Sequence, residues 1–216
     1  DATLSDAVQG AVRGMFMHQG QACISSSRIY VQKGIYPEFI KAYTGAVSKL
    51  GVGDLRDPAT IIGPIISDRQ RERIKRHIRD AQDKGANIVV GGDWEGNRCH
   101  PTVLTNVTED MECHAEETFG PVVSVYQVED LDEGLVAANN SRYGLSSAIY
   151  TNDFNSALRY ARAIESGMVH VNGPSVTDEA HVPFGGVGDS GFGREGTEAD
   201  IDALTELKWV TMQTKT

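Results

Sequence analysis

The chain has 216 residues, enough for one large α/β domain or two small ones, and no apolar run approaches the roughly 20 residues of a membrane-spanning helix. Its formal net charge of −10 argues against general binding to nucleic acid or to anionic membranes. The cysteines Cys23, Cys99 and Cys113 are an odd number without paired spacing, which favours a reducing compartment, and we expect a cytoplasmic protein.

The first predicted element is an amphipathic helix over residues 4–17, because apolar residues recur there at helical spacing and Thr3 with Asp6 resembles a capping box. The helix leads into residues 20–28, a loop of small residues that carries Cys23. A thiol with little bulk around it and backbone N–H groups nearby can act as a nucleophile. A buried, inert cysteine is the more common situation, so both interpretations stay open at this point.

The rest of the chain alternates between strand and helix patterns. Strands are predicted at residues 28–33, 88–90, 122–128, 146–150 and 168–171, and helices at residues 37–51, 67–85, 131–139 and 154–165. This alternation predicts an α/β fold with an open, largely parallel, twisted sheet flanked by helices. The apolar run at residues 207–212 is typical of an isolated strand, and we expect it to pair with another chain.

The helix predicted at residues 67–85 begins with a second capping box, formed by Ser67 and Gln70. It is rich in arginine, but acidic residues are interleaved with the basic ones. This spacing is typical of a solvated, ion-paired helix face and does not favour a nucleic-acid surface.

Two motifs suggest binding sites that their context does not support. Residues 186–191 match the dinucleotide-binding pattern G-x-G-x-x-G, but Pro183-Phe184 precedes them in place of a strand, so we predict a tight glycine-rich turn. Cys99-His100 and Cys113-His114 lack the spacing of usual zinc ligands, and we predict no metal site.

Residues 116–121 place two carboxylates and an aromatic ring beside a Gly-Pro turn, just before a predicted strand. A solvated turn is the simple interpretation. A carboxylate at such a position could also accept hydrogen bonds from a sugar diol, as acidic residues do in dinucleotide sites.

Taken together, these segments resemble the catalytic part of the NAD(P)-dependent aldehyde dehydrogenase superfamily, from Asp1 to the end of the chain. The segments that carry the resemblance are residues 20–23 with Arg28, 63–64, 101–103, 116–121, 143–145, 167–172, and 183–186 with 190–191. The resemblance implies a catalytic domain over residues 1–203 and a C-terminal oligomerisation strand over residues 204–216. It also implies that the cofactor-binding domain is absent from this chain.

By this resemblance, Cys23 is the catalytic nucleophile of an enzyme that oxidises an aldehyde to the carboxylic acid with NAD or NADP, through a thiohemiacetal and a thioester. Glu117 would bind the cofactor's ribose, and Phe119 would contact the nicotinamide. The aldehyde pocket would be lined by Ala22, Ile24, Val176, Thr177 and Phe184. Residues 172–174, 178–181 and 205–209 are similar to bacterial aromatic-aldehyde dehydrogenases of the salicylaldehyde and vanillin type, which implies an aromatic aldehyde as substrate.

The family's glycine-rich cofactor-binding half, its general-base glutamate and its oxyanion-hole asparagine lie upstream of the cysteine motif and are not in this chain. We therefore expect a domain of a longer, homo-oligomeric enzyme (dimer or tetramer), inactive on its own, with the cofactor held mainly by the other half. Two alternatives stay open: an acylating dehydrogenase that transfers the thioester to coenzyme A, and a non-catalytic assembly module that retains the fold.

Overall fold

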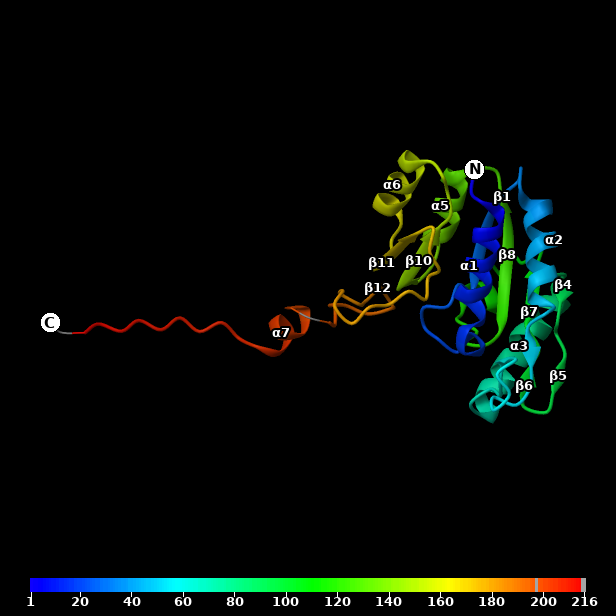
Figure 1. Cartoon of the computed structure of the whole chain (residues 1–216), viewed down its shortest axis with the longest axis horizontal. Coiled ribbons are helices and arrows are strands. Elements are labelled where there is room, and N and C mark those ends of the chain that lie inside the picture. Colours follow the sequence, from blue (N-terminus) through cyan, green and yellow to red (C-terminus); the bar gives the residue numbers. More distant parts are fainter. Residues whose placement is uncertain (197, 215–216) are drawn as a thin grey trace.

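The structure is a computed structural model that describes residues 1–196 and 198–214 (Figure 1). Its helices are α1 (Leu4–Phe16), α2 (Tyr36–Val47), α3 (Asp68–Asp83), α4 (Glu112–Ala115), α5 (Leu131–Asn139), α6 (Phe154–Ala163) and α7 (Glu198–Leu204). Its strands are β1 (Arg28–Gln32), β2 (Gly51–Val52), β3 (Thr60–Ile62), β4 (Asn87–Val90), β5 (Trp94–Glu95), β6 (Arg98–Cys99), β7 (Thr102–Thr105), β8 (Val122–Val128), β9 (Tyr143–Gly144), β10 (Ser146–Ile149), β11 (Met168–Val171) and β12 (Val187–Gly188). The predicted α/β alternation is therefore present.

A four-stranded sheet in the order β1-β8-β7-β4 forms the centre of the molecule. Both β1 and β7 run parallel to β8, and β4 runs antiparallel to β7 at one edge. Parallel strands need crossover connections, and the helices between them supply these. The sheet is thus largely parallel, with one antiparallel edge strand that the sequence pattern did not reveal.

The two faces of this sheet carry separate hydrophobic cores, because successive strand residues point to opposite sides. On one face, Val123 and Val125 of β8 pack with side chains of α1 and α2. On the other face, Val122 and Leu104 pack with side chains of α3 and α4. The sheet is therefore covered by helices on both sides, as Figure 1 shows.

A second, separate pair of parallel strands, β10 and β11, lies next to α5 in Figure 1, apart from the four-stranded sheet. The helices next to these strands begin at side-chain caps, because Asp130 accepts hydrogen bonds from the first turn of α5 and Asp153 does the same for α6. Within the described residues, β1 pairs only with β8 and β10 pairs only with β11, so each keeps one open edge. The single continuous sheet expected from the alternation is therefore divided in this chain.

Of the two predicted capping boxes, the structure confirms the cap of α3 and contradicts that of α1. Ser67 accepts a hydrogen bond from the Gln70 amide at 3.3 Å, which confirms it as the cap of α3. Thr3 precedes α1, but its side chain makes no capping hydrogen bond, so the first capping box is wrong. The second helix ends at Val47, and Gly51, predicted as its end, begins the short strand β2.

The G-x-G-x-x-G segment is a turn, as predicted. Val187 and Gly188 pair antiparallel with β9, and the hydroxyl of Ser190 accepts a hydrogen bond from the Gly144 amide at 3.0 Å. The next helix, α7, begins only at Glu198. The segment therefore lacks the strand-loop-helix context that a phosphate-binding loop of this kind requires.

Beyond α7, residues 205–214 run away from the body of the molecule and are exposed (Figure 1). They form no strand within the described chain, so their pairing with another chain stays a prediction, and residues 215–216 lie outside the described part. In the described residues, no helix has the length and apolar character needed to cross a membrane.

Candidate active site

The loop that carries Cys23 begins with a left-handed turn at the end of α1. His18, Gln19 and Gly20 all have positive φ angles, of 51°, 59° and 66°, so the backbone reverses direction there. The returning segment is held against α1 by a hydrogen bond of 3.0 Å from the Ser26 amide to the Gly14 carbonyl. Cys23 lies on this loop and is exposed.

Gly20 brings the cysteine loop into contact with the segment that carries Glu117 and Phe119. A Cβ atom added at Gly20 would lie 2.4 Å from the Gly120 carbonyl oxygen, a distance that real Cβ atoms do not reach. Because only a glycine permits this approach, Gly20 allows the two backbones to pack against each other. The contact explains why two segments almost one hundred residues apart meet at one site.

Ala22, Cys23, Glu117 and Phe119 all line one cavity of about 550 Å³. The open edges of β1 and β10 line the same cavity. The cavity thus unites the predicted nucleophile with both predicted cofactor-binding residues and with one predicted pocket residue.

The other four predicted pocket residues are not among the residues that line this cavity: Ile24, Val176, Thr177 and Phe184. Val176 is buried and Thr177 is exposed, while the backbone of Phe184 pairs with Glu195. Their role in an aldehyde pocket stays a prediction.

A serine pair nevertheless joins the cysteine loop to the segment that contains Val176. The hydroxyl oxygens of Ser26 and Ser175 lie 2.6 Å apart, and the Ser175 hydroxyl also donates to the Ile24 carbonyl at 2.7 Å. Residues 174–177 therefore lie directly against the Cys23 loop, although only Pro174 and Ser175 of them reach the cavity.

Cys23 differs from the other two cysteines in its accessibility. Cys99 and Cys113 are buried, and burial raises the pKa of the Cys99 thiol to about 12 and raises that of Cys113. A thiol that stays protonated is a poor nucleophile and a poor metal ligand. The described residues contain no group of three or more potential ligands that could hold a metal ion.

Glu117 is half-buried at the cavity wall, and its burial raises the pKa of its carboxyl group. The nearby guanidinium of Arg73 acts in the opposite direction, but burial has the larger effect. Phe119, two residues on, has a φ angle of 53°, which few residues other than glycine adopt. Both are therefore held in environments that an exposed turn would not provide, which corrects the simple interpretation of this segment.

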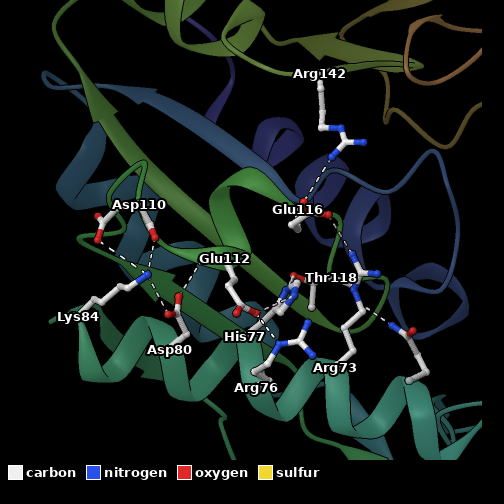
Figure 2. Close-up of polar contacts among 11 residues, drawn as sticks. Arg73, Arg76, His77, Asp80, Lys84, Asp110, Glu112, Glu116, Thr118 and Arg142 are labelled. Carbon is white, nitrogen blue, oxygen red and sulfur yellow. Dashed lines mark hydrogen bonds and ion pairs between the residues drawn. The ribbon is translucent and has the colours of Figure 1, made fainter.

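One face of α3 supports this segment, while the opposite face is the solvated, ion-paired one that the charge pattern predicts. The side-chain nitrogen of Gln70 donates to the carbonyls of Thr118 and Phe119. Arg73 lies 3.6 Å from the Glu116 carboxylate, as the dashed contact in Figure 2 marks. Ion pairs such as Lys75–Glu72 do lie on the outer side, as predicted. The alternation of acidic and basic residues predicts the outer, solvated face of α3. The inner face could have been predicted only from the helical spacing of Gln70, Ile74 and His77, which carry no charge.

His77 completes the contact between α3 and the loop. It is fully buried, and its Nδ1 atom lies 3.0 Å from the Thr118 hydroxyl (Figure 2). Its Nε2 atom lies 3.4 Å from a carboxylate oxygen of Glu112. Burial, together with the nearby charge of Arg73, lowers the pKa of His77 to about 4 and keeps the ring neutral at pH 7.

Comparison with known proteins places this geometry in a family. The sequence model of the family described as "Aldehyde dehydrogenase family" matches residues 1–210 of this chain. A curated relative, the vanillin dehydrogenase of Pseudomonas fluorescens, is 43% identical over 213 residues, which are 99% of this chain and 44% of the relative. The chain thus spans somewhat less than half the length of the curated relatives it matches.

Solved structures agree with the sequence comparison. The crystal structure of a salicylaldehyde dehydrogenase from Pseudomonas putida G7, complexed with salicylaldehyde, superposes with a TM-score of 0.94 at 42% identity and covers 99% of this chain and 44% of that one. The betaine aldehyde dehydrogenase of Staphylococcus aureus in complex with NAD+ gives a TM-score of 0.90 at 36% identity, over 94% of this chain and 42% of that one. A glyceraldehyde-3-phosphate dehydrogenase from Methanocaldococcus jannaschii complexed with NADP gives a TM-score of 0.89 at 36% identity, over 94% of this chain and 44% of that one.

Proposed function

The chain belongs to the aldehyde dehydrogenase family, and from this premise we propose that residues 1–203 form the catalytic domain of an enzyme that oxidises aldehydes through Cys23. The observation that carries the proposal is the shared cavity, which an exposed cysteine lines together with Glu117 and Phe119. The cofactor-binding half would belong to the part of the relatives' length that this chain does not cover.

In the proposed reaction, the Cys23 thiolate forms a carbon–sulfur bond with the aldehyde carbon, and the carbonyl oxygen becomes an alkoxide. The Cys23 backbone N–H, for which the described residues show no acceptor, would donate to that oxygen. Loss of hydride from the same carbon leaves a thioester on Cys23. Water then adds, the carbon–sulfur bond breaks, and the carboxylic acid leaves as the thiol is restored.

The residues at the cavity fit a nicotinamide dinucleotide. Glu117 offers carboxylate oxygens that can accept hydrogen bonds from the two ribose hydroxyls, and Phe119 offers an aromatic ring beside them. NAD or NADP, when bound, supplies the acceptor for the hydride. The proposal includes both NAD and NADP, because we expect the residues that read the 2′ position of the adenosine ribose to lie in the nucleotide-binding half, which this chain does not cover.

We further propose a small aromatic aldehyde as the substrate. The relatives named vanillin and salicylaldehyde dehydrogenase are more than 40% identical to this chain over almost its whole length. Ala22 at the cavity wall would supply part of the surface that an aromatic ring requires. The other predicted pocket residues do not line the cavity of this chain but would contribute to the pocket of the complete enzyme: Ile24, Val176, Thr177 and Phe184.

The first test replaces the sulfur of Cys23 in the complete polypeptide that contains these residues. In the Cys23→Ser variant we expect reduced-nicotinamide formation from benzaldehyde or salicylaldehyde to fall at least about a thousandfold, because an alcohol is a far weaker nucleophile than a thiolate. Cys99→Ala serves as the matched control and should keep most of the activity, since this cysteine is buried and is not among the residues that line the cavity.

Two outcomes would contradict the proposal. Cys23→Ser with activity equal to the wild type would exclude Cys23 as the nucleophile. Turnover that requires coenzyme A and releases a thioester would replace hydrolysis by the acylating reaction.

A further inference from the structure

Three side chains of α3 contact the segment between Glu117 and Gly120 from one face of the helix. Gln70, Ile74 and His77 are spaced four and three residues apart, so they lie above one another along the helix. Gln70 bonds to the backbone, His77 to the Thr118 hydroxyl, and a Cβ atom at Gly120 would lie 2.3 Å from Ile74 Cδ1. The helix therefore matches the shape of this backbone closely.

Gln70 makes the most specific of these contacts. Its side-chain nitrogen donates to the Thr118 carbonyl at 2.7 Å and to the Phe119 carbonyl at 2.9 Å, so both of its N–H groups are used. The two carbonyls are consecutive, and one planar amide therefore fixes the orientation of the peptide groups on both sides of Phe119.

The backbone at this point needs such support. Phe119 has a φ angle of 53°, in the left-handed region, which is sterically disfavoured for a residue with a Cβ atom. Such conformations persist when the surrounding structure holds them. The two hydrogen bonds from Gln70 hold the carbonyls on either side of Phe119 and so act directly on the backbone that sets the directions of Glu117 and Phe119.

We propose that Gln70 is a positioning residue of the cofactor site, whose two hydrogen bonds to the Thr118 and Phe119 carbonyls set the directions in which Glu117 and Phe119 face a bound nicotinamide dinucleotide. This inference rests on the proposed function of those two residues. It extends the site to a helix whose charge pattern alone indicates only a solvated surface.

The test replaces Gln70 by methionine, which has a similar length and no N–H donor, in the complete polypeptide. We expect the KM for NAD or NADP, whichever the wild type uses, to rise about tenfold, which corresponds to about 1.4 kcal/mol. The rate at which Cys23 is acylated by p-nitrophenyl acetate without cofactor should stay within about twofold of the wild type, because the cysteine loop does not contact Gln70. Gln82→Met, an exposed glutamine on the same helix, is the matched control and should leave both values unchanged.

A second variant separates hydrogen bonding from space filling. Gln70→Lys restores N–H donors at the end of a flexible chain, and we expect it to recover much of the cofactor affinity that methionine loses. If Gln70→Met does not fold, Gln70→Glu replaces it as the variant without N–H donors. Glutamate keeps the shape of glutamine but places a carboxylate against the two carbonyl oxygens, so it should show the same rise in the cofactor KM.

The outcomes distinguish this inference from the proposed function. An active wild type whose cofactor KM is unchanged in a folded Gln70→Met variant would overturn the role of Gln70 alone, as would methionine performing as well as lysine. A wild type that fails to oxidise any aldehyde with either cofactor would overturn the proposed function itself.

Discussion

Glu117 combines partial burial with a carboxyl group that must be ionised to accept hydrogen bonds from a ribose diol. Because burial raises its pKa above the ordinary value for glutamate, Glu117 takes up a proton at a higher pH than an exposed carboxylate would. We therefore expect the cofactor KM to increase as the pH is lowered through this raised pKa. Steady-state kinetics across the acidic range would show the increase, and in the Glu117→Gln variant the KM should be high and independent of pH over that range.

His77 makes the stability of the fold depend on pH. Its pKa of about 4 lies below the ordinary value of about 6.5, so the unfolded chain takes up a proton at a pH where the native state still does not. The contribution is fully present above pH 6.5 and is lost as the pH falls toward 4, by about 2 kcal/mol at pH 5. Urea unfolding of wild type at pH 7 and pH 5 measures this loss.

The matched comparison for His77 uses two variants that remove one histidine each. His77→Asn should lower the stability at pH 7 but remove this part of the pH dependence, whereas His181→Asn, at an exposed position, should keep it. Equal pH dependence in wild type and His77→Asn would show that His77 is not the group responsible.

At the level of single elements, the site depends on the close approach of two loops at Gly20 and Gly120. In Gly20→Ala the new methyl group would meet the Gly120 carbonyl oxygen, and the positive φ angle adds further strain, so we expect a loss of about 2 kcal/mol or more in the free energy of unfolding. Gly45→Ala is the control, because nothing lies within 4 Å of its added Cβ and alanine favours the helix α2. It should be neutral or stabilising by up to about 1 kcal/mol; equal effects of the two substitutions would contradict the contact.

The elements themselves followed largely from sequence periodicity. Strand β8 and helix α5 have the predicted bounds, because a valine-rich run and a regular apolar spacing are local signals. The support of Thr118 by His77 is not a local signal, since the two residues lie 41 positions apart and neither is unusual in its own segment. Family resemblance indicated Cys23 and Glu117, but only the folded chain shows the helix behind them.

At the scale of the whole molecule, residues 205–214 are the part that the rest of the described chain does not explain. Leu207, Trp209 and Met212 are almost completely exposed, which is unfavourable for large apolar side chains in water. We propose that the segment beyond α7, predicted from the sequence as residues 204–216, pairs with another chain as an intermolecular strand, although the structure assigns Leu204 to the end of α7. Truncation after Leu204 in the complete polypeptide should therefore lower the number of subunits per particle, as measured by sedimentation velocity. A truncated protein with the same number of subunits as the wild type would contradict this role.

The open edges of β1 and β10 have a consequence for how this chain behaves when it is made and purified. Each edge presents backbone N–H and C=O groups that have no strand partner in the described residues, and such edges recruit extended segments from other molecules. Produced as residues 1–216 alone, the chain should precipitate or form soluble aggregates at high concentration during refolding. Dilute conditions should raise the yield of monodisperse material, which light scattering would report.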